Sequence, residues 1–137
     1  MNYDIILIED ELENLFPNNP FNLKKDFKSI DIRLKKEIIQ EIAAQLIKGF
    51  NRKECCKLYY KQYNNLLIVL TKIRIKLEHK KTSIRSILII DNYNHLCLIL
   101  HLYEKKNKEN LSKYELNSAK KMLDYYYNKL IKENKNE

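Results

Sequence analysis

Basic residues occupy alternate positions near the middle of this 137-residue chain. Lys72, Arg74 and Lys76 are separated from one another by Ile73 and Ile75. A period of two is typical of a β-strand, in which alternate side chains project from the same face. The pattern therefore predicts a strand with three cations on one face and an apolar opposite face.

More cations follow this segment. Arg85 lies in the next apolar segment, and pairing of the two strands would bring it to the cationic face. A charged loop after residues 95–103 supplies Lys105, Lys106 and Lys108. Guanidinium and ammonium groups bind phosphate oxygens and stabilise the charge that develops on a phosphate under attack. Arginine and lysine side chains in this arrangement indicate a site that binds the phosphates of an RNA backbone.

Three side chains near these cations are not permanently charged and could stack on a base or transfer a proton. Tyr103 precedes the charged loop and Tyr114 follows it, and a tyrosine can stack on a base or move a proton. His101 shares the alternation of Tyr103, together with Cys97 and Ile99. We expect His101 on the cationic face, where it could contact RNA or carry a proton, although a lone histidine in a sheet is usually structural.

Composition limits the possible partners and cofactors. With 26 basic and 18 acidic residues, the net charge is +8, which favours a nucleic acid, an acidic protein or an anionic membrane. No apolar run is long enough for a membrane span and no signal peptide is recognisable, so we expect a cytoplasmic protein. The three cysteines have neither disulfide-framework nor zinc spacing, and no glycine-rich phosphate loop occurs. We therefore expect no metal and no cofactor.

The apolar pattern predicts one α+β domain over residues 1–137, with residues 133–137 frayed. A first strand is followed by two N-terminal helices, a three-strand antiparallel meander and a C-terminal helix, giving a four-stranded, mainly antiparallel sheet. The expected strands cover residues 3–8, 66–78, 84–90 and 95–103, and the expected helices cover 23–48, 51–65 and 112 onward.

The start of the last helix is the best-defined boundary. Ser112 followed by Glu115 forms a capping box, and Leu111 and Leu116 occupy the hydrophobic-staple positions. The buried stripe of this helix is expected to include Leu116, Ala119, Leu123, Tyr126 and Leu130.

The second half of the chain resembles the RelE/ParE toxin superfamily. The resemblance rests on the alternation at 72–77, a short polar turn, and Arg85 near the start of the next strand. It continues through Leu98–Tyr103, the lysine-rich segment 104–110 and the Leu111-Ser112 cap, and covers residues 66–126. The turn at 79–83 is longer than in typical members and lacks their glycine, and lysine stands where they have arginine after the last strand.

The resemblance implies a RelE-like fold and a ribosome-dependent mRNA endonuclease, the toxin of a type II toxin-antitoxin system. Such an enzyme inhibits translation by directing an RNA 2′-hydroxyl onto the adjacent phosphate. The implied partners are an acidic antitoxin, the ribosome and mRNA. The matching positions imply a catalytic set of Arg74, Lys76, Arg85, Lys106 and Tyr114, and an RNA-binding set of Lys72, Lys105, Lys108 and His101.

Other interpretations remain open at this point. ParE-like members of the superfamily inhibit DNA gyrase and lack the nuclease's basic set. A helix-turn-helix DNA-binding domain would need residues 64–77 to be helical, which the alternation and β-branched content oppose. A phosphoacceptor receiver domain is suggested only by the opening apolar run and its acids. An RNA- or protein-binding module without catalysis is also consistent with a lysine-rich sheet.

Overall fold

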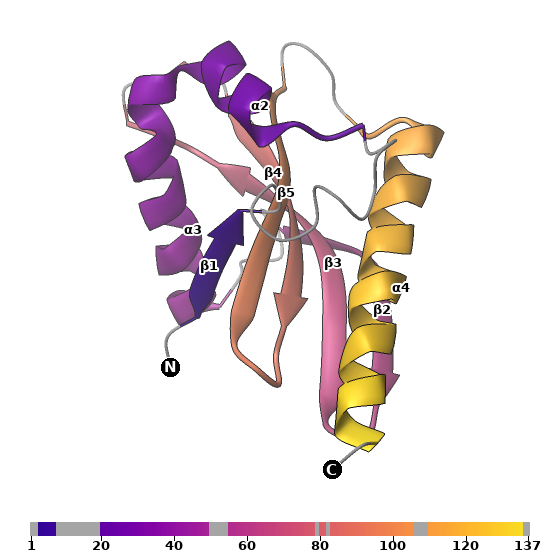
Figure 1. Ribbon diagram of the computed structural model, residues 1–137. Helices are drawn as coiled ribbons and strands as arrows, with labels where there is room; N and C mark the ends of the chain where they lie inside the picture. Colours follow the sequence, from indigo (N-terminus) through magenta and orange to yellow (C-terminus); the bar gives the residue numbers. More distant parts are fainter. Residues whose placement is uncertain are drawn as a thin grey trace.

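The structure, a computed structural model, contains a five-stranded sheet with helices packed against it (Figure 1). It describes residues 3–7, 20–49, 55–78, 80–81, 83–105 and 110–135. In this part of the chain the fold is α+β, as predicted.

The sheet has the strand order β1-β5-β4-β3-β2 and is mixed. Its strands are β1 (Asp4–Leu7), β2 (Cys55–Tyr63), β3 (Leu66–Ile75), β4 (Ile84–Asp91) and β5 (Leu96–Glu104). Strands β2 to β5 form an antiparallel meander, because their short connections leave no room for a crossover. Strand β1 pairs in parallel with β5, which the long intervening chain permits.

The prediction of a helix over 51–65 is wrong, because residues 55–63 form the edge strand β2. Residues 51–54, where that helix was expected to begin, lie outside the described residues. Three tyrosines favour a strand here. Tyr63 pairs with Leu66 across a two-residue turn, in which Asn64 has a φ of 52°. Asparagine tolerates this left-handed conformation, so the two asparagines close a hairpin rather than end a helix. The sheet therefore has five strands instead of four.

The single helix predicted for 23–48 is divided into α2 (Leu23–Ile30), the 3-10 turn η1 (Ile32–Leu34) and α3 (Lys35–Lys48). Asp31 causes the break: its carboxylate accepts a hydrogen bond from the Arg33 backbone N–H at 3.0 Å. Such a local bond competes with helix continuation. Gly49 ends α3 with a φ of 80°, a left-handed conformation that glycine adopts readily.

Helices lie on either side of the sheet in Figure 1, with α3 at the left and α4 (Lys113–Lys135) at the right. Helix α4 packs along β2 and β3, where the Tyr59 hydroxyl donates to Asp124 at 2.8 Å. The predicted capping box is confirmed: Glu115 N–H donates to Ser112 Oγ at 3.1 Å, and Ser112 N–H donates to Glu115 Oε1 at 3.0 Å. Ala119 and Leu123 are fully buried, as expected for the stripe of this helix.

A β-bulge in β5 changes which side chains share a face. His101 pairs with Ile87, but Ile99 pairs with Leu88, so one residue of β5 is left over between them. His101 and Ile99 consequently project from opposite faces, and the prediction that they share one is wrong. His101 and Tyr103 lie beyond the bulge and do share a face.

Two alternatives conflict with this fold. A helix-turn-helix domain needs helix over residues 64–77, but Leu66–Ile75 is a strand at the centre of the meander. A receiver domain needs alternating strands and helices around a parallel sheet, whereas β2 to β5 are antiparallel. Among the described residues, no helix is both long enough and apolar enough to cross a membrane.

Leu123→Ala is expected to lower the free energy of unfolding by about 2–5 kcal/mol, the range for a buried leucine truncated to alanine. Leu123 is 0% exposed between α4 and the sheet. Urea denaturation measures the change, and Tyr125→Ala, at an exposed position of the same helix, is the control. A loss below about 1 kcal/mol would show that this side chain is not part of the core.

The thiols provide a second test of the fold. Burial raises the pKa of Cys97 to about 12, so this thiol stays protonated at pH 8 and reacts poorly. Cys56 is exposed on β2. We expect an aromatic disulfide reagent at pH 8 to label Cys56 rapidly and Cys97 only after unfolding in urea. Equal labelling rates in Cys56→Ser and Cys97→Ser variants would contradict the assigned burial.

Candidate nucleic-acid interface

Strand pairing brings two arginines and a tyrosine into one row across the sheet. Arg74 of β3 lies directly opposite Arg85 of β4, and Arg85 lies opposite Tyr103 of β5. Directly paired residues project from the same face, so the three side chains are neighbours. We call Arg74, Arg85 and Tyr103 the arginine row. Arg74 and Arg85 therefore lie on one face of the sheet, as the sequence predicted.

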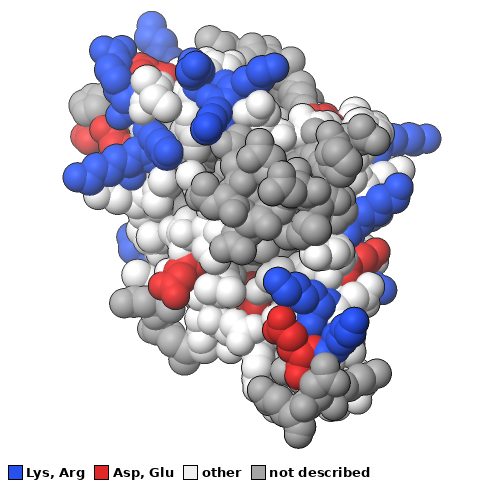
Figure 2. Space-filling model, viewed as in Figure 1, with Lys and Arg blue, Asp and Glu red and all other residues white. Residues whose placement is uncertain are grey.

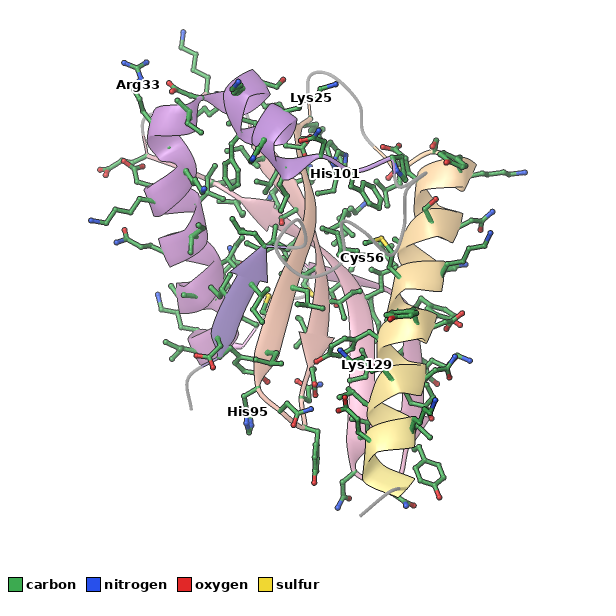
Figure 3. The ribbon with its side chains drawn as sticks, viewed as in Figure 1. Lys25, Arg33, Cys56, His95, His101 and Lys129 are labelled. Carbon is green, nitrogen blue, oxygen red and sulfur yellow. The ribbon has the colours of Figure 1, made fainter. Side chains whose placement is uncertain are left out.

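The next row of the same face contains Lys72, Ile87 and His101. Lys72 Nζ donates to Asn110 Oδ1 at 3.1 Å, which links β3 to the segment before α4. His101 is 7% exposed and lies between α2 and the start of α4 (Figure 3). Its ring packs against Phe21, with a centroid separation of 5.0 Å, and stacks on Tyr103 at 5.3 Å.

Asp26 of α2 fixes the orientation of His101. Its Oδ2 atom lies 2.9 Å from His101 Nδ1 and accepts the Leu102 backbone N–H at 3.1 Å. Among the described residues, β1 pairs with β5 as far as Ile99, and beyond that point the Asp26 carboxylate accepts the Leu102 N–H. An ionised carboxylate only accepts hydrogen bonds, which places a proton on Nδ1.

Glu115 closes the cluster from α4. Its Oε1 completes the capping box, while Oε2 lies 3.6 Å from His101 Nε2. Burial raises the pKa of the Tyr103 phenol, the positive charge of Arg85 opposes this shift, and the negative charge of Glu115 adds to it. Tyr103 therefore remains a neutral phenol at physiological pH. Together, Asp26 and Glu115 place negative charge on the His101 side of the arginine row.

Arg85 retains unused hydrogen-bonding capacity. Its Nη1 atom is buried and has no hydrogen-bond partner in the part of the chain that the structure describes. A buried donor of this kind costs free energy unless it is satisfied. An anion between the two arginines would satisfy it and would offset the repulsion between like charges paired across strands.

The remaining predicted residues are more scattered. Lys76 lies one residue beyond β3 and is exposed; Lys105 follows β5 and is also exposed. Tyr114 is exposed in the first turn of α4. Lys106 and Lys108 lie outside the described residues. The described residues contain no group of His, Cys, Asp and Glu side chains that could hold a metal ion.

Sequence reasoning missed the two carboxylates of this cluster. Asp26 belongs to no recognisable sequence motif, because its partner His101 lies 75 positions away in the chain. Glu115 was identified as a capping residue, and its approach to His101 depends on how α4 packs. Tyr103 was noted beside the charged loop but was included in neither the catalytic set nor the RNA-binding set.

Comparison with known protein families, with characterised proteins and with solved structures finds no match to this chain. The likeness to RelE/ParE toxins therefore rests on the residue pattern of 66–126 alone, and the roles that it implies remain predictions.

Asp26→Asn tests the contact that holds His101. Loss of the charged acceptor is expected to lower the free energy of unfolding by roughly 1–3 kcal/mol. Urea denaturation at pH 7 measures the change. Glu37→Gln removes a carboxylate from an exposed position of α3 and should leave stability nearly unchanged. Equal stability of the two variants would show that the Asp26 bond contributes little.

Proposed function

We propose that the protein is a ribosome-dependent mRNA endonuclease that inhibits translation, the toxin of a type II toxin-antitoxin system. The observation that carries the proposal is the direct pairing of Arg74 with Arg85, with a buried Arg85 donor left for an anion. Paired guanidinium groups suit a phosphate, because each can donate two parallel hydrogen bonds to its oxygens.

The proposed reaction uses only groups within the RNA as nucleophile and leaving group. The 2′-oxygen attacks the adjacent phosphorus and loses its proton to a basic group. The bond from phosphorus to the 5′-oxygen breaks, and that oxygen takes up a proton. The products are a 2′,3′-cyclic phosphate and a 5′-hydroxyl. Arg74 and Arg85 would stabilise the extra negative charge on the phosphoryl oxygens during attack.

Exposure separates residues that could touch RNA from those that position others. Lys76 and Tyr114 are exposed, and we assign them to contacts with the RNA near the reacting atoms. His101 is buried between Asp26 and Glu115, so in this conformation it acts as a positioning residue. Lys72 and Lys105 would bind the backbone on either side, with Lys106 and Lys108 as further cations.

The proposed partners follow from charge. The ribosome and mRNA are polyanions, which a protein of net charge +8 approaches readily. An acidic antitoxin laid over the arginine row would neutralise it and block access to RNA.

The test is a cell-free translation reaction with purified protein, in which primer extension maps new mRNA 5′ ends. Arg85→Ala is expected to slow ribosome-dependent cleavage by about 10² or more, the size for losing one group that stabilises developing charge. Arg85→Lys should recover part of the activity, because it restores the charge but not the fork.

Lys132→Ala, at an exposed position near the end of α4, is the matched control and should cleave normally. Circular dichroism and urea denaturation establish that each variant is folded. Full activity of a folded Arg85→Ala variant would show that Arg85 is not part of the catalytic site. Intact mRNA with the unmodified protein would defeat the nuclease proposal; gyrase inhibition or RNA binding without cleavage would then be tested.

A further inference from the structure

The arginine row lies beside the loop of the β3–β4 hairpin. Arg74 is the last residue but one of β3, and Arg85 is the second residue of β4, so they form the last pair but one before the loop 76–83. A loop of this length fixes the strand ends less firmly than a two-residue turn, and like charges in opposite positions repel. The separation of the two guanidinium groups therefore depends on what holds this loop.

Lys80 attaches the described part of this loop to two other elements. Its Nζ atom lies 3.1 Å from Glu104 Oε1, at the end of β5, and donates to the Ile30 carbonyl, at the end of α2, at 3.3 Å. The Lys80 backbone N–H donates to the Leu77 carbonyl at 3.1 Å, which turns the chain at this point. One side chain thus joins the β3–β4 loop to β5 and α2. We call the Lys80–Glu104 pair the loop anchor.

Burial distinguishes the loop anchor from the surface charges of the protein. Figure 2 shows lysine and arginine side chains gathered on the surface over α2 and the start of α3. In the loop anchor, by contrast, the Lys80 side chain is 19% exposed and the Glu104 side chain is 3% exposed. A carboxylate at this depth depends on a nearby cation, because removal of one partner leaves the other charge poorly compensated. The pair therefore fixes the position of the loop more firmly than a surface ion pair would.

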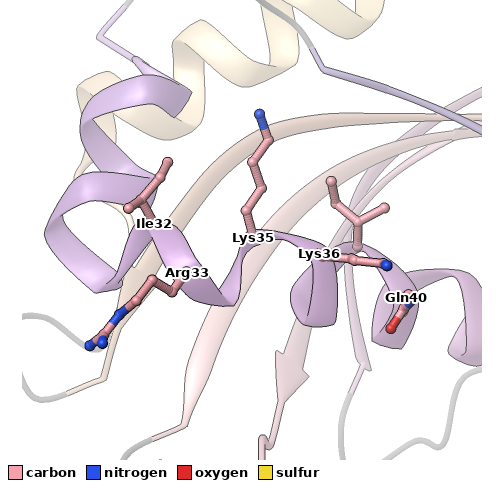
Figure 4. Close-up of a pocket in the computed structure, with 6 residues that line it drawn as sticks. Ile32, Arg33, Lys35, Lys36 and Gln40 are labelled. Carbon is pink, nitrogen blue, oxygen red and sulfur yellow. The ribbon is translucent and has the colours of Figure 1, made fainter.

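The end of α2, to which Lys80 is bonded, is held by contacts of its own. Asp31 follows the last residue of α2, and its carboxylate pairs with Arg33 at 2.9 Å. The hydrogen bonds from Arg33 lower the pKa of Asp31, and the positive charge of Lys80 adds to this shift. Figure 4 shows Arg33 on η1, pointing away from Lys35 at the start of α3. Lys80 is thus bonded to a turn that local contacts stabilise.

Glu104 connects the loop anchor to the arginine row through the backbone. It pairs with Ile84 across β4 and β5, and the next pair along β4 contains Arg85. The Lys105 backbone N–H donates to the Ser83 carbonyl at 3.2 Å, which continues the contact between these two segments beyond the start of β4. Arg85 therefore lies one residue from the strand ends that the loop anchor holds.

We propose that Lys80 is a positioning residue for the arginine row. By joining the loop to β5 and α2, it holds the ends of β3 and β4 at the separation in which Arg74 and Arg85 bind one phosphate between them. Glu104 follows Tyr103 in β5, so its side chain projects from the opposite face of the sheet, and the loop anchor acts without touching the phosphate. The inference rests on the proposed binding of phosphate by the two arginines.

The first measurement is nuclear magnetic resonance of the arginine Nε–H groups in the full chain, which needs no ligand. In Lys80→Met, which keeps the apolar stem and removes the charge, the Nε–H signals of Arg74 and Arg85 are expected to shift. Lys80→Arg restores the cation and should return the signals toward their positions in the unmodified protein. Lys81→Met, at the exposed neighbouring lysine, is the matched control and should leave both signals in place.

A double variant keeps the test valid if Lys80→Met does not fold. Lys80→Met combined with Glu104→Gln removes both charges of the loop anchor, so no carboxylate is left buried without its cation. The same shifts of the arginine signals are expected in this variant. Unmoved signals in a folded variant that lacks the loop anchor, or equal shifts in Lys81→Met, would overturn the proposal.

Pyrophosphate binding, measured by calorimetry, tests the consequence for the site. The dissociation constant is expected to rise about 2- to 30-fold in Lys80→Met, the range for residues that influence a site without touching its ligand, and to recover in Lys80→Arg. Unchanged affinity in a folded Lys80→Met variant would contradict the positioning role. If pyrophosphate does not bind the unmodified protein, the phosphate site of the proposed function fails, and the shifts of the arginine signals alone decide whether Lys80 positions the two side chains.

Discussion

The pairing of Arg74 with Arg85 places two guanidinium groups side by side on one face of a sheet. Like charges in directly opposed positions repel and destabilise the pair. The neighbouring elements accommodate this arrangement: Tyr103 continues the row as a neutral phenol, and the carboxylates of Asp26 and Glu115 lie beyond it at His101. Negative charge therefore lies on the His101 side of the arginine row.

His101 connects three elements, β5, α2 and α4, that are distant from one another in the sequence. Its strand belongs to the meander, its Nδ1 partner belongs to α2, and its Nε2 neighbour belongs to the capped start of α4. A shift of either helix would disturb the ring that stacks on Tyr103. The geometry of the arginine row thus depends on how α2 and α4 pack against the sheet.

Local patterns predicted the parts of the fold that local interactions determine. The alternation around Arg74 and the capping box at Ser112 each involve neighbouring residues, and both features are present. Residues 55–63 were misassigned because tyrosines at helical spacing also suit a strand, and the hairpin with β3 decides between them. The β5 bulge and the Asp26–His101 bond depend on distant packing, which no short pattern encodes.

The parallel pairing of β1 with β5 has a consequence for how the chain assembles. Asp4 is synthesised long before Leu96, its partner in the sheet. The meander from β2 to β5 can close through short-range hairpins, while β1 must wait until most of the chain exists. Once β5 has formed and until β1 pairs with it, the edge of β5 is a strand of apolar residues whose backbone groups can bond to another strand. Strand β1, which precedes the other four strands in the chain, is thus the last of the five to be paired.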